Sequence, residues 1–482
     1  MKKEAIVIYP SPHIGHLIST MELGRLILSV RPSTTLHILV SPPSPTEGCG
    51  AATTMASYIS AVSATSGSSI SFHRLPDVSL PPDFSVRSAV PEIAMDLELL
   101  RLHTPNVRSA IESISEGHYV RALVIDFFCP YALPVARELS VPCYYYFTSG
   151  ISVLSCFIYL DIHHKVLPKS FKDLDRNLSI HVPGVPSFQP LDMPPTVLDR
   201  EDQAYEFFLE SSRNLQRTDG VIVNSFEEYE PRAFRYAVEG HCTPGGTMPP
   251  LYCIGPVISA FNDGPSGSKN GTKEVPECLS WLDDQPSKSV IFLCFGSRGV
   301  FPKEQLKEIA IGLERSGHRF LWMVRNPLNH PDSDLNQLLP DGFLERTRER
   351  GFVVKSWAPQ AAVLKHDSVG GFVTHCGWNS ILESITAGVP MITWPLYAEQ
   401  RLNQLLLVKE IKVAVSMNAS KEGLVTALEV EARVRELMDS EVGKSVRERT
   451  LTMKAAAEAA ISPNGSSRAA LVRLVDSWNI GY

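Results

Sequence analysis

Residues 372–387 have the sequence Phe372-Val-Thr-His-Cys-Gly-Trp-Asn-Ser-Ile-Leu-Glu-Ser-Ile-Thr-Ala387. The residues Phe372–Thr374 predict a buried strand, Gly377 opens a turn, and the residues from Ser380 onward predict a helix that ends at Ala387. Asn379 and Ser380 carry side chains that are favoured at a helix N-cap. A strand that leads through a turn into a helix is the building unit of doubly wound α/β folds.

Short apolar segments alternate with amphipathic segments along the rest of the chain. Strands that are apolar throughout are buried on both faces, and strands that alternate with helices form parallel sheets. The clearest helical patterns are Leu17–Leu28, Lys303–Arg315 and Ser380–Ala387. We predict strands at Ala5–Tyr9, Leu36–Ser41, Ala122–Phe127, Cys143–Thr148, Val221–Asn224, Val290–Phe295, Phe320–Val324, Phe352–Lys355, Phe372–Thr374, Met391–Trp394 and Val413–Ser416.

The middle of the chain lacks this alternation. Residues 243–276 are rich in Pro, Gly and Ser, which predicts a linker or a surface loop. A chain of 482 residues is long enough for two large domains. We therefore expect an α/β protein with two lobes, residues 1–242 and 277–461, each built around its own doubly wound parallel sheet.

The composition argues against several kinds of partner. The formal net charge is −7, so neither nucleic acid nor an anionic membrane is an expected partner. No apolar run reaches the roughly 18 residues of a membrane-spanning helix, and the short run Ala5–Tyr9 before Pro10 does not fit a secretory signal. The nine cysteines are widely spaced and include no Cys-x-x-Cys pair, which indicates reduced thiols in a cytoplasmic protein.

Two polar residues end apolar strands in the first half. His16 follows the first strand in the segment Tyr9-Pro-Ser-Pro-His-Ile-Gly-His16, where an imidazole suits a general base. Asp126 ends a later strand, and parallel strands bring their carboxyl ends to one edge, so Asp126 could orient His16. The alternatives are a structural hydrogen bond from His16 and a turn capped by Asp126. No Gly-x-Ser-x-Gly nucleophile occurs, and His13-x-x-His16 has no third ligand nearby, so we expect neither a covalent intermediate nor a metal.

The segment from Trp357 to Gln400 is the second candidate site. A helix N-terminus with His375, Asn379 and Ser380 suits a phosphate, although an ordinary capped helix is the simpler alternative. Glu383 suits the hydroxyls of a ribose or is a solvated helix charge. The Trp357 ring suits a nucleotide base or core packing. Glu399 and Gln400 offer hydrogen-bonding groups to sugar hydroxyls.

The 44 residues from Trp357 to Gln400 resemble the nucleotide-sugar signature of plant family 1 UDP-glycosyltransferases. The loop Pro10–His16, Asp126 and the turn Phe295-Gly-Ser297 also resemble that family. The resemblance implies a GT-B fold, with an N-terminal lobe for the acceptor and a C-terminal lobe for the UDP-sugar. It further implies that the last segment, from about residue 462 to 482, packs back onto the N-terminal lobe.

The resemblance also assigns residues to the UDP-sugar. Trp357 stacks on uracil, with Ala358 and Gln360 beside it, and Glu383 holds the ribose. Four side chains and one glycine surround the diphosphate: Ser297, His375, Asn379, Ser380 and Gly377. The sugar is met by Thr148, Trp378, Glu399 and Gln400. On the acceptor side we place His13, where many relatives have Gly, and Phe127.

The expected reaction is an inverting transfer of glucose from UDP-glucose to a phenolic acceptor, a flavonoid, a chalcone or a relative of these, to give a β-O-glucoside. The same scaffold also suits C-glucosylation of a phenolic ring, and a non-catalytic UDP-sugar-binding protein is the alternative of another class. A nicotinamide oxidoreductase is disfavoured because no Gly-x-Gly-x-x-Gly follows a strand. We expect a monomer without a metal or any cofactor beyond its co-substrate.

Overall fold

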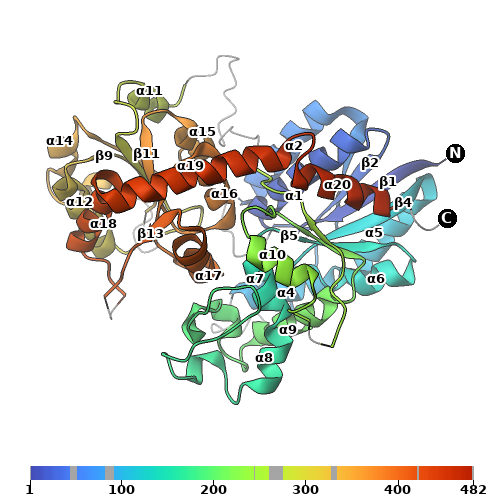
Figure 1. The fold of residues 1–482 in the computed structure, drawn as a ribbon. Coiled ribbons are helices and arrows are strands. Elements are labelled where there is room, and N and C mark those ends of the chain that lie inside the picture. Colours follow the sequence, from blue (N-terminus) through green and yellow to red (C-terminus); the bar gives the residue numbers. More distant parts are fainter. Residues whose placement is uncertain are drawn as a thin grey trace. The chain divides into compact units, whose positions relative to one another are not determined.

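The computed structural model describes residues 2–43, 51–81, 92–243, 245–259, 275–326, 334–355, 357–420 and 423–479. The chain forms two compact units. Unit 1 comprises Met1–Ser259 and Ala459–Tyr482, and unit 2 comprises Ala260–Glu458. Figure 1 colours unit 1 from blue to green, with its C-terminal segment in red, and unit 2 mainly from yellow to red.

Unit 1 contains a seven-stranded sheet in the order β3-β2-β1-β4-β5-β6-β7. All neighbouring strands are parallel. The order reverses between β1 and β4, which places the carboxyl ends of these two strands at a topological switch point, where α/β folds bind ligands. The strands are β1 (Lys3–Tyr9), β2 (Thr35–Val40), β3 (Ile70–Arg74), β4 (His118–Asp126), β5 (Cys143–Phe147), β6 (Gly220–Val223) and β7 (Leu251–Cys253).

Helices flank this sheet. They are α1 (Ile14–Val30), α2 (Ala51–Ser66), α4 (Glu92–Leu102), α5 (Thr104–Gly117), α6 (Ala132–Glu138), α7 (Ile151–Ile158), α8 (Leu160–Val166), α9 (Gln203–Leu215), α10 (Pro231–Val238) and α20 (Ser466–Ser477). Short 3-10 helices cover η2 (Gly67–Ser69), η3 (Phe171–Asp173), η4 (Pro190–Asp192) and η5 (Pro195–Val197). Most residues of β1, β2 and β4 to β7 are buried, as expected for strands of a parallel sheet, whereas β3 at the edge buries only Ile70.

The C-terminal helix α20 belongs to unit 1, although it follows unit 2 in the sequence. Figure 1 shows it in red beside the blue helix α1, and it also contacts β7. Ser467 donates to the Gly255 carbonyl at 2.5 Å, and Arg31 donates to Asn479 at 2.7 Å. The Trp478 ring meets the Tyr144 ring edge-on at 6.2 Å.

Unit 2 contains a six-stranded parallel sheet in the order β10-β9-β8-β11-β12-β13. Its strands are β8 (Val290–Cys294), β9 (Arg319–Val324), β10 (Gly351–Lys355), β11 (Val369–Thr374), β12 (Met391–Thr393) and β13 (Ala414–Ser416). Its helices are α11 (Glu277–Asp283), α12 (Lys303–Ser316), α13 (Leu335–Leu338), α14 (Phe343–Thr347), α15 (Gln360–Lys365), α16 (Trp378–Ala387), α17 (Gln400–Leu405), the π-helix η6 (Leu406–Ile411), α18 (Ala427–Asp439) and α19 (Glu441–Ile461), whose last turn belongs to unit 1.

Every strand predicted from the sequence is present, and no strand end differs from the prediction by more than four residues. Two further strands, β3 and β7, complete the sheet of unit 1. The segment 243–276 is therefore not a linker throughout, because it contains β7; residues 260–274 of it lie outside the described ranges. Both missed strands lie at sheet edges: β3 alternates apolar and polar residues, and β7 has three residues between Pro250 and Pro256. Among the described residues, no helix combines the length and hydropathy needed to cross a membrane.

Candidate active site

His16 lies in the first turn of α1, which starts at Ile14, three residues earlier than the expected start near Leu17. The helix starts there because the extended residue His13 serves as its N-cap and its carbonyl accepts from the N–H groups of His16 and Leu17 at 3.0 Å. His16 Nδ1 lies 2.7 Å from Asp126 Oδ2 at the end of β4. A carboxylate accepts hydrogen bonds, so Nδ1 carries a proton and Nε2 is the nitrogen that can accept one.

Asp126 makes both of the interactions that the sequence left open. Its Oδ2 faces His16, while its Oδ1 accepts from the backbone N–H of Phe128 at 3.0 Å. The second bond forms a turn directly after β4, and it fixes the carboxylate plane. The carboxylate is almost completely buried, whereas the His16 side chain is 24% exposed. The pair therefore combines a rigid, buried carboxylate with an imidazole that solvent or a ligand can reach.

Phe128 is the aromatic neighbour of this pair. Its ring meets the His16 ring edge-on, with centroids 5.5 Å apart. Phe127, which the sequence analysis placed on the acceptor side, is 3% exposed and packs against Phe147, Phe157 and Phe208. Phe127 and Phe128 lie in the turn after β4, where the Phe128 ring meets His16 and the Phe127 ring belongs to a buried aromatic group. The placement of Phe127 on the acceptor side stays a prediction.

His13 contacts a carboxylate of its own. Its Nε2 lies 3.3 Å from Asp96 Oδ2 on α4, and its side chain is only 17% exposed. Its ring centroid is 6.0 Å from that of His16. His13 is therefore a mostly buried residue with a carboxylate partner and not a solvent-facing loop residue. Asp96 was missed, although its spacing of four and seven residues from the buried Leu100 and His103 was a signal that it lies on the inner face of α4.

The first turn of α16 forms the second part of the candidate site, in unit 2. Gly377 is the N-cap, with extended backbone and no side-chain cap. Because Gly377 is the N-cap, Asn379 and Ser380 lie inside the first turn and not at the N-cap as expected. Ser380 Oγ accepts a hydrogen bond from Gln360. A helix N-terminus without a side-chain cap presents its backbone N–H groups to an anion.

His375 lies beside this N-terminus and is buried. Burial lowers the pKa of His375 to about 4, so its imidazole is neutral at neutral pH. Its Nδ1 has no hydrogen-bond partner among the described residues. Two glycines make room for the ring: a Cβ atom on Gly296 or Gly377 would lie 2.7 or 2.4 Å from Nε2. A neutral imidazole in this position can donate one N–H hydrogen bond without adding a charge.

Gln360, Ser380 and Glu383 form a hydrogen-bonded group. The Gln360 amide donates to Ser380 Oγ at 2.9 Å and to Glu383 Oε2 at 2.8 Å. Burial raises the pKa of the Glu383 carboxyl, and the Gln360 bond partly opposes that effect. Trp357 is 40% exposed and, with Pro359 and residues of β10, lines a cavity of about 300 Å³. The Trp357 ring is thus available for stacking, in contrast to the alternative of core packing.

Glu399 and Gln400 lie where α17 begins. Gln400 is buried, and its Oε1 accepts from the backbone N–H groups of Leu396 and Tyr397 at 2.8 and 2.9 Å. Two N–H donors fix the orientation of the amide, so only its NH₂ group can serve a ligand. Of the other expected donor residues in this unit, Ala358 and Trp378 are buried, whereas Ser297 is exposed in the turn after β8.

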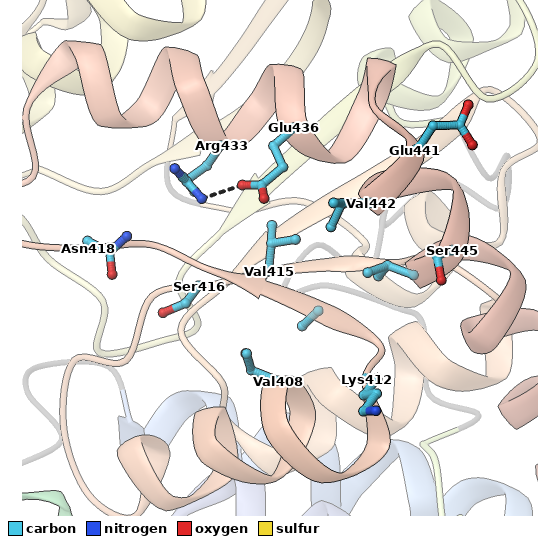
Figure 2. Close-up of a pocket in the computed structure, with 12 residues that line it drawn as sticks. Val408, Lys412, Val415, Ser416, Asn418, Arg433, Glu436, Glu441, Val442 and Ser445 are labelled. Carbon is cyan, nitrogen blue, oxygen red and sulfur yellow. Dashed lines mark hydrogen bonds and ion pairs between the residues drawn. The ribbon is translucent and has the colours of Figure 1, made fainter.

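The predicted residues thus fall into two groups. His13, His16, Asp126, Phe127 and Thr148 lie in unit 1, where half-buried Thr148 follows β5, and all the other predicted site residues lie in unit 2. A cavity of about 610 Å³ in unit 2, shown in Figure 2, contains none of them. Residues of β13, η6, α18 and α19 line it, including the ion pair of Arg433 and Glu436. In the described ranges, no group of three or more His, Cys, Asp and Glu side chains is arranged to hold a metal.

Sequence comparisons agree on one family. The family profile described as "UDP-glucoronosyl and UDP-glucosyl transferase" matches residues 271–446. UDP-glycosyltransferase 88B1 of Stevia rebaudiana is 47% identical over 480 residues, which cover 99% of each chain. Isoflavone 7-O-glucosyltransferase 1 of Glycine max is 46% identical over 489 residues and also covers 99% of each chain. The chain belongs to the plant family 1 UDP-glycosyltransferases.

Solved structures support the fold assignment of this UDP-glycosyltransferase. A UDP-glucosyltransferase of Polygonum tinctorium capable of glucosylating indoxyl, in complex with 3,4-dichloroaniline, gives a TM-score of 0.87 at 36% identity, with both chains fully covered. A Medicago truncatula relative in complex with UDP-glucose gives a TM-score of 0.85 at 33% identity, covering 99% of this chain and 98% of that one. The protein has the GT-B fold, whose two Rossmann-like lobes correspond to the two parallel sheets.

Proposed function

We propose that this UDP-glycosyltransferase transfers glucose from UDP-glucose to a hydroxyl group of a phenolic acceptor and forms a β-O-glucoside. The observation that carries the proposal is the His16–Asp126 pair, with its 2.7 Å contact, on a chain that also has the complete segment Trp357–Gln400. The acceptor class is supported by relatives such as isoflavone 7-O-glucosyltransferase 1 of Glycine max and the 45% identical phloretin 2'-O-glucosyltransferase of Pyrus communis.

The reaction needs a base and a displaced leaving group. His16 Nε2 removes the proton of the acceptor hydroxyl, and Asp126 stabilises the imidazolium that results. The acceptor oxygen forms a bond to the anomeric carbon of glucose on the face opposite UDP. The bond between that carbon and the β-phosphate oxygen breaks, its electron pair leaves with UDP, and the configuration inverts. The proton on His16 then returns to solvent.

Unit 2 supplies the donor-binding groups in this proposal. Trp357 stacks on uracil next to Ala358. Glu383 holds the ribose, and Gln360 orients the Glu383 carboxylate through the 2.8 Å hydrogen bond. The α16 N-terminus from Gly377 onward, with Ser297, His375, Asn379 and Ser380, binds the diphosphate. Because the His375 imidazole is neutral, it contributes as a hydrogen-bond donor. The sugar hydroxyls are contacted by Trp378, Glu399, the Gln400 NH₂ group and Thr148.

Unit 1 supplies the acceptor side. The Phe128 ring beside His16 suits an aromatic acceptor, since edge-to-face contacts between rings are favourable. A phenol has a pKa near roughly 10, so its proton is easier to remove than that of an aliphatic alcohol. We place His13, with its partner Asp96, next to the acceptor and not next to the donor, because it shares the loop of His16.

A panel of flavonoids, dihydrochalcones and simple phenols with UDP-glucose, analysed by mass spectrometry, tests the proposal. We expect UDP release that depends on the acceptor, together with a product heavier by one hexose. Treatment with acid separates O-glucosides, which hydrolyse, from C-glucosides, which do not. Binding of UDP-glucose without turnover of any phenol would identify a non-catalytic binding protein instead.

We also propose that the enzyme works as a monomer in the cytoplasm. The eight described cysteines are buried and unpaired, which suits a reducing compartment; Cys49 lies outside the described residues. Burial raises the pKa of thiols such as Cys143 and Cys376, so they are poorly reactive. Microscopy of a fluorescent fusion and light scattering of the purified enzyme test these two points.

A further inference from the structure

A buried amide outside the predicted site joins two of its loops. Asn403 lies on α17, one turn after Glu399, and is fully buried. Its Nδ2 donates to the Cys376 carbonyl at 2.9 Å and to Glu399 Oε1 at 3.3 Å. Cys376 lies in the loop that leads from β11 to the α16 N-terminus, and Glu399 is a proposed sugar ligand. One NH₂ group thus serves the phosphate loop and the sugar loop together.

The phosphate loop needs such support because its backbone is strained. Cys376 has a φ of +67°, in the left-handed region that residues with a Cβ atom rarely adopt. A strained residue keeps its conformation only where its surroundings fix it. Here the Cys376 N–H donates to Thr374 Oγ1 at 3.2 Å, and Asn403 holds the Cys376 carbonyl.

The carbonyl of Cys376 and the N–H of Gly377 belong to the same peptide group. In a trans peptide these two bonds point in opposite directions. Asn403, by holding the carbonyl, therefore turns the Gly377 N–H away from α17. That N–H group stands at the N-cap of α16, where the proposed diphosphate site begins.

The amide is not arranged for the best stability at its own position. Asn403 Oδ1 has no hydrogen-bond partner among the described residues. A buried acceptor without a partner is destabilising, so Oδ1 contributes nothing favourable at this position. Of the two polar groups of this side chain, the described residues thus engage only the NH₂ group, through Cys376 and Glu399.

We propose that Asn403 is a positioning residue of the donor site, which sets the direction of the phosphate loop and holds the Glu399 carboxylate. This inference rests on the proposed binding of UDP-glucose by unit 2. It assigns a functional role to a residue that lies beyond the segment Trp357–Gln400 and is not expected to touch either substrate.

The variants Asn403→Leu and Asn403→Asp test the proposal. Leucine removes both hydrogen bonds at a similar volume, and aspartate places an acceptor against two other acceptors. We expect the Kd of UDP and of UDP-glucose, measured by calorimetry, to rise by about tenfold or more, the effect of losing hydrogen bonds that include one to a charged group. The KM of the acceptor at saturating donor should stay unchanged, and so should the circular dichroism spectrum.

Gln404 provides the matched control on the same helix. Its Nε2 bonds to Thr393 Oγ1 at 3.0 Å and to Ser416 Oγ at 3.1 Å, on β12 and β13 and not on the donor loops. Gln404→Leu should lower Tm but leave the Kd of UDP unchanged. Folded Asn403 variants with wild-type Kd values, or an equal loss of UDP affinity in Gln404→Leu, would overturn the inference. If the wild-type enzyme itself does not bind UDP-glucose, the proposed function fails, and the inference fails with it.

Discussion

His16 and Asp126 are 110 residues apart in the sequence, and the role of each can be tested separately. His16→Ala should reduce transfer to a simple phenol by about 10²–10⁴-fold, the usual worth of a general base. UDP affinity measured by calorimetry should be retained, because the proposed donor residues lie in unit 2. Near-normal transfer by His16→Ala at neutral pH would refute the assignment.

Two substitutions of Asp126 separate its two bonds. Asp126→Asn keeps an oxygen for the Phe128 N–H, so the turn after β4 and the Tm should persist. Its NH₂ group faces His16 Nδ1 and favours the tautomer that carries the proton on Nε2, so transfer should fall. Asp126→Ala should lose transfer and also lower Tm. If Asp126→Asn unfolds the protein, the carboxylate has a structural role instead.

Glu383 and Gln400 should affect different parts of the donor. Glu383→Ala should weaken the binding of UDP and of UDP-glucose alike by about 1.5–3 kcal/mol, the usual loss when a hydrogen bond to a charged group is removed. Gln400→Glu keeps an acceptor for the Leu396 and Tyr397 N–H groups but removes the NH₂ group. This variant should bind UDP-glucose more weakly and bind UDP with unchanged affinity. Calorimetry with both ligands decides, and a parallel loss for Gln400→Glu would contradict a sugar contact.

His13 should influence the choice of acceptor. His13→Gly should leave UDP-glucose affinity unchanged and alter the relative kcat/KM of phenols with and without a second hydroxyl by several-fold, since a neutral hydrogen bond contributes about 0.5–1.5 kcal/mol. Asp96→Asn should shift this ratio in the same direction, because Asp96 contacts the His13 ring. Ratios equal to those of the wild type in both variants would mean that the pair only fixes the loop to α4.

At the scale of the elements, three histidines lie together on β2, β3 and β4. His37 Nδ1 is 2.9 Å from His73 Nε2, and the His118 ring lies 4.6 Å from that of His37. Burial, with smaller effects of the two neighbouring imidazoles, lowers the pKa of His37 from 6.5 to about 4, and burial and His118 lower that of His73. The folded state therefore favours the neutral forms of both rings.

This cluster should make the protein less stable in acid. Above pH 6.5 His37 is neutral in both states and does not affect the free energy of unfolding. Between pH 6.5 and about 4 only the unfolded chain takes up the proton, so stability falls with pH. In His37→Gln, urea unfolding followed from pH 7.5 to about 4.5 should show a shallower decrease than in the wild type. Parallel curves for the two proteins would exclude this role.

The elements were predictable where burial is uniform. The segments Ala5–Tyr9 of β1, Ala122–Ile125 of β4 and Val290–Cys294 of β8 are continuous apolar runs, and such runs are visible in the sequence. β7 was missed because three residues between prolines carry no period, and only pairing with β6 makes them a strand. The start of α16 was misplaced because Gly377, without a side chain, serves as its N-cap.

At the scale of the whole molecule, the His16–Asp126 contact was predictable because parallel strands end at one edge of a sheet. Contacts between elements that do not share a sheet edge could not be predicted from the sequence. Asp96 reaches His13 from a separate helix, Phe128 faces His16 through a turn that Asp126 forms, and Asn403 meets Cys376 from α17. Each of these three contacts depends on how a helix or turn packs against another element. The hydrophobic periodicity of the sequence describes only the element in which it occurs.

The return of α20 to unit 1 has a consequence for protein synthesis. The ribosome produces the seven strands of unit 1 first, yet α20, which covers α1 and β7, emerges only after all of unit 2. Until then, the surfaces that receive Leu471, Leu474 and Trp478 remain open to water and to chaperones. Unit 2 is continuous in the sequence and can complete its fold before the nascent chain is released. The unit that is begun first is thus finished last.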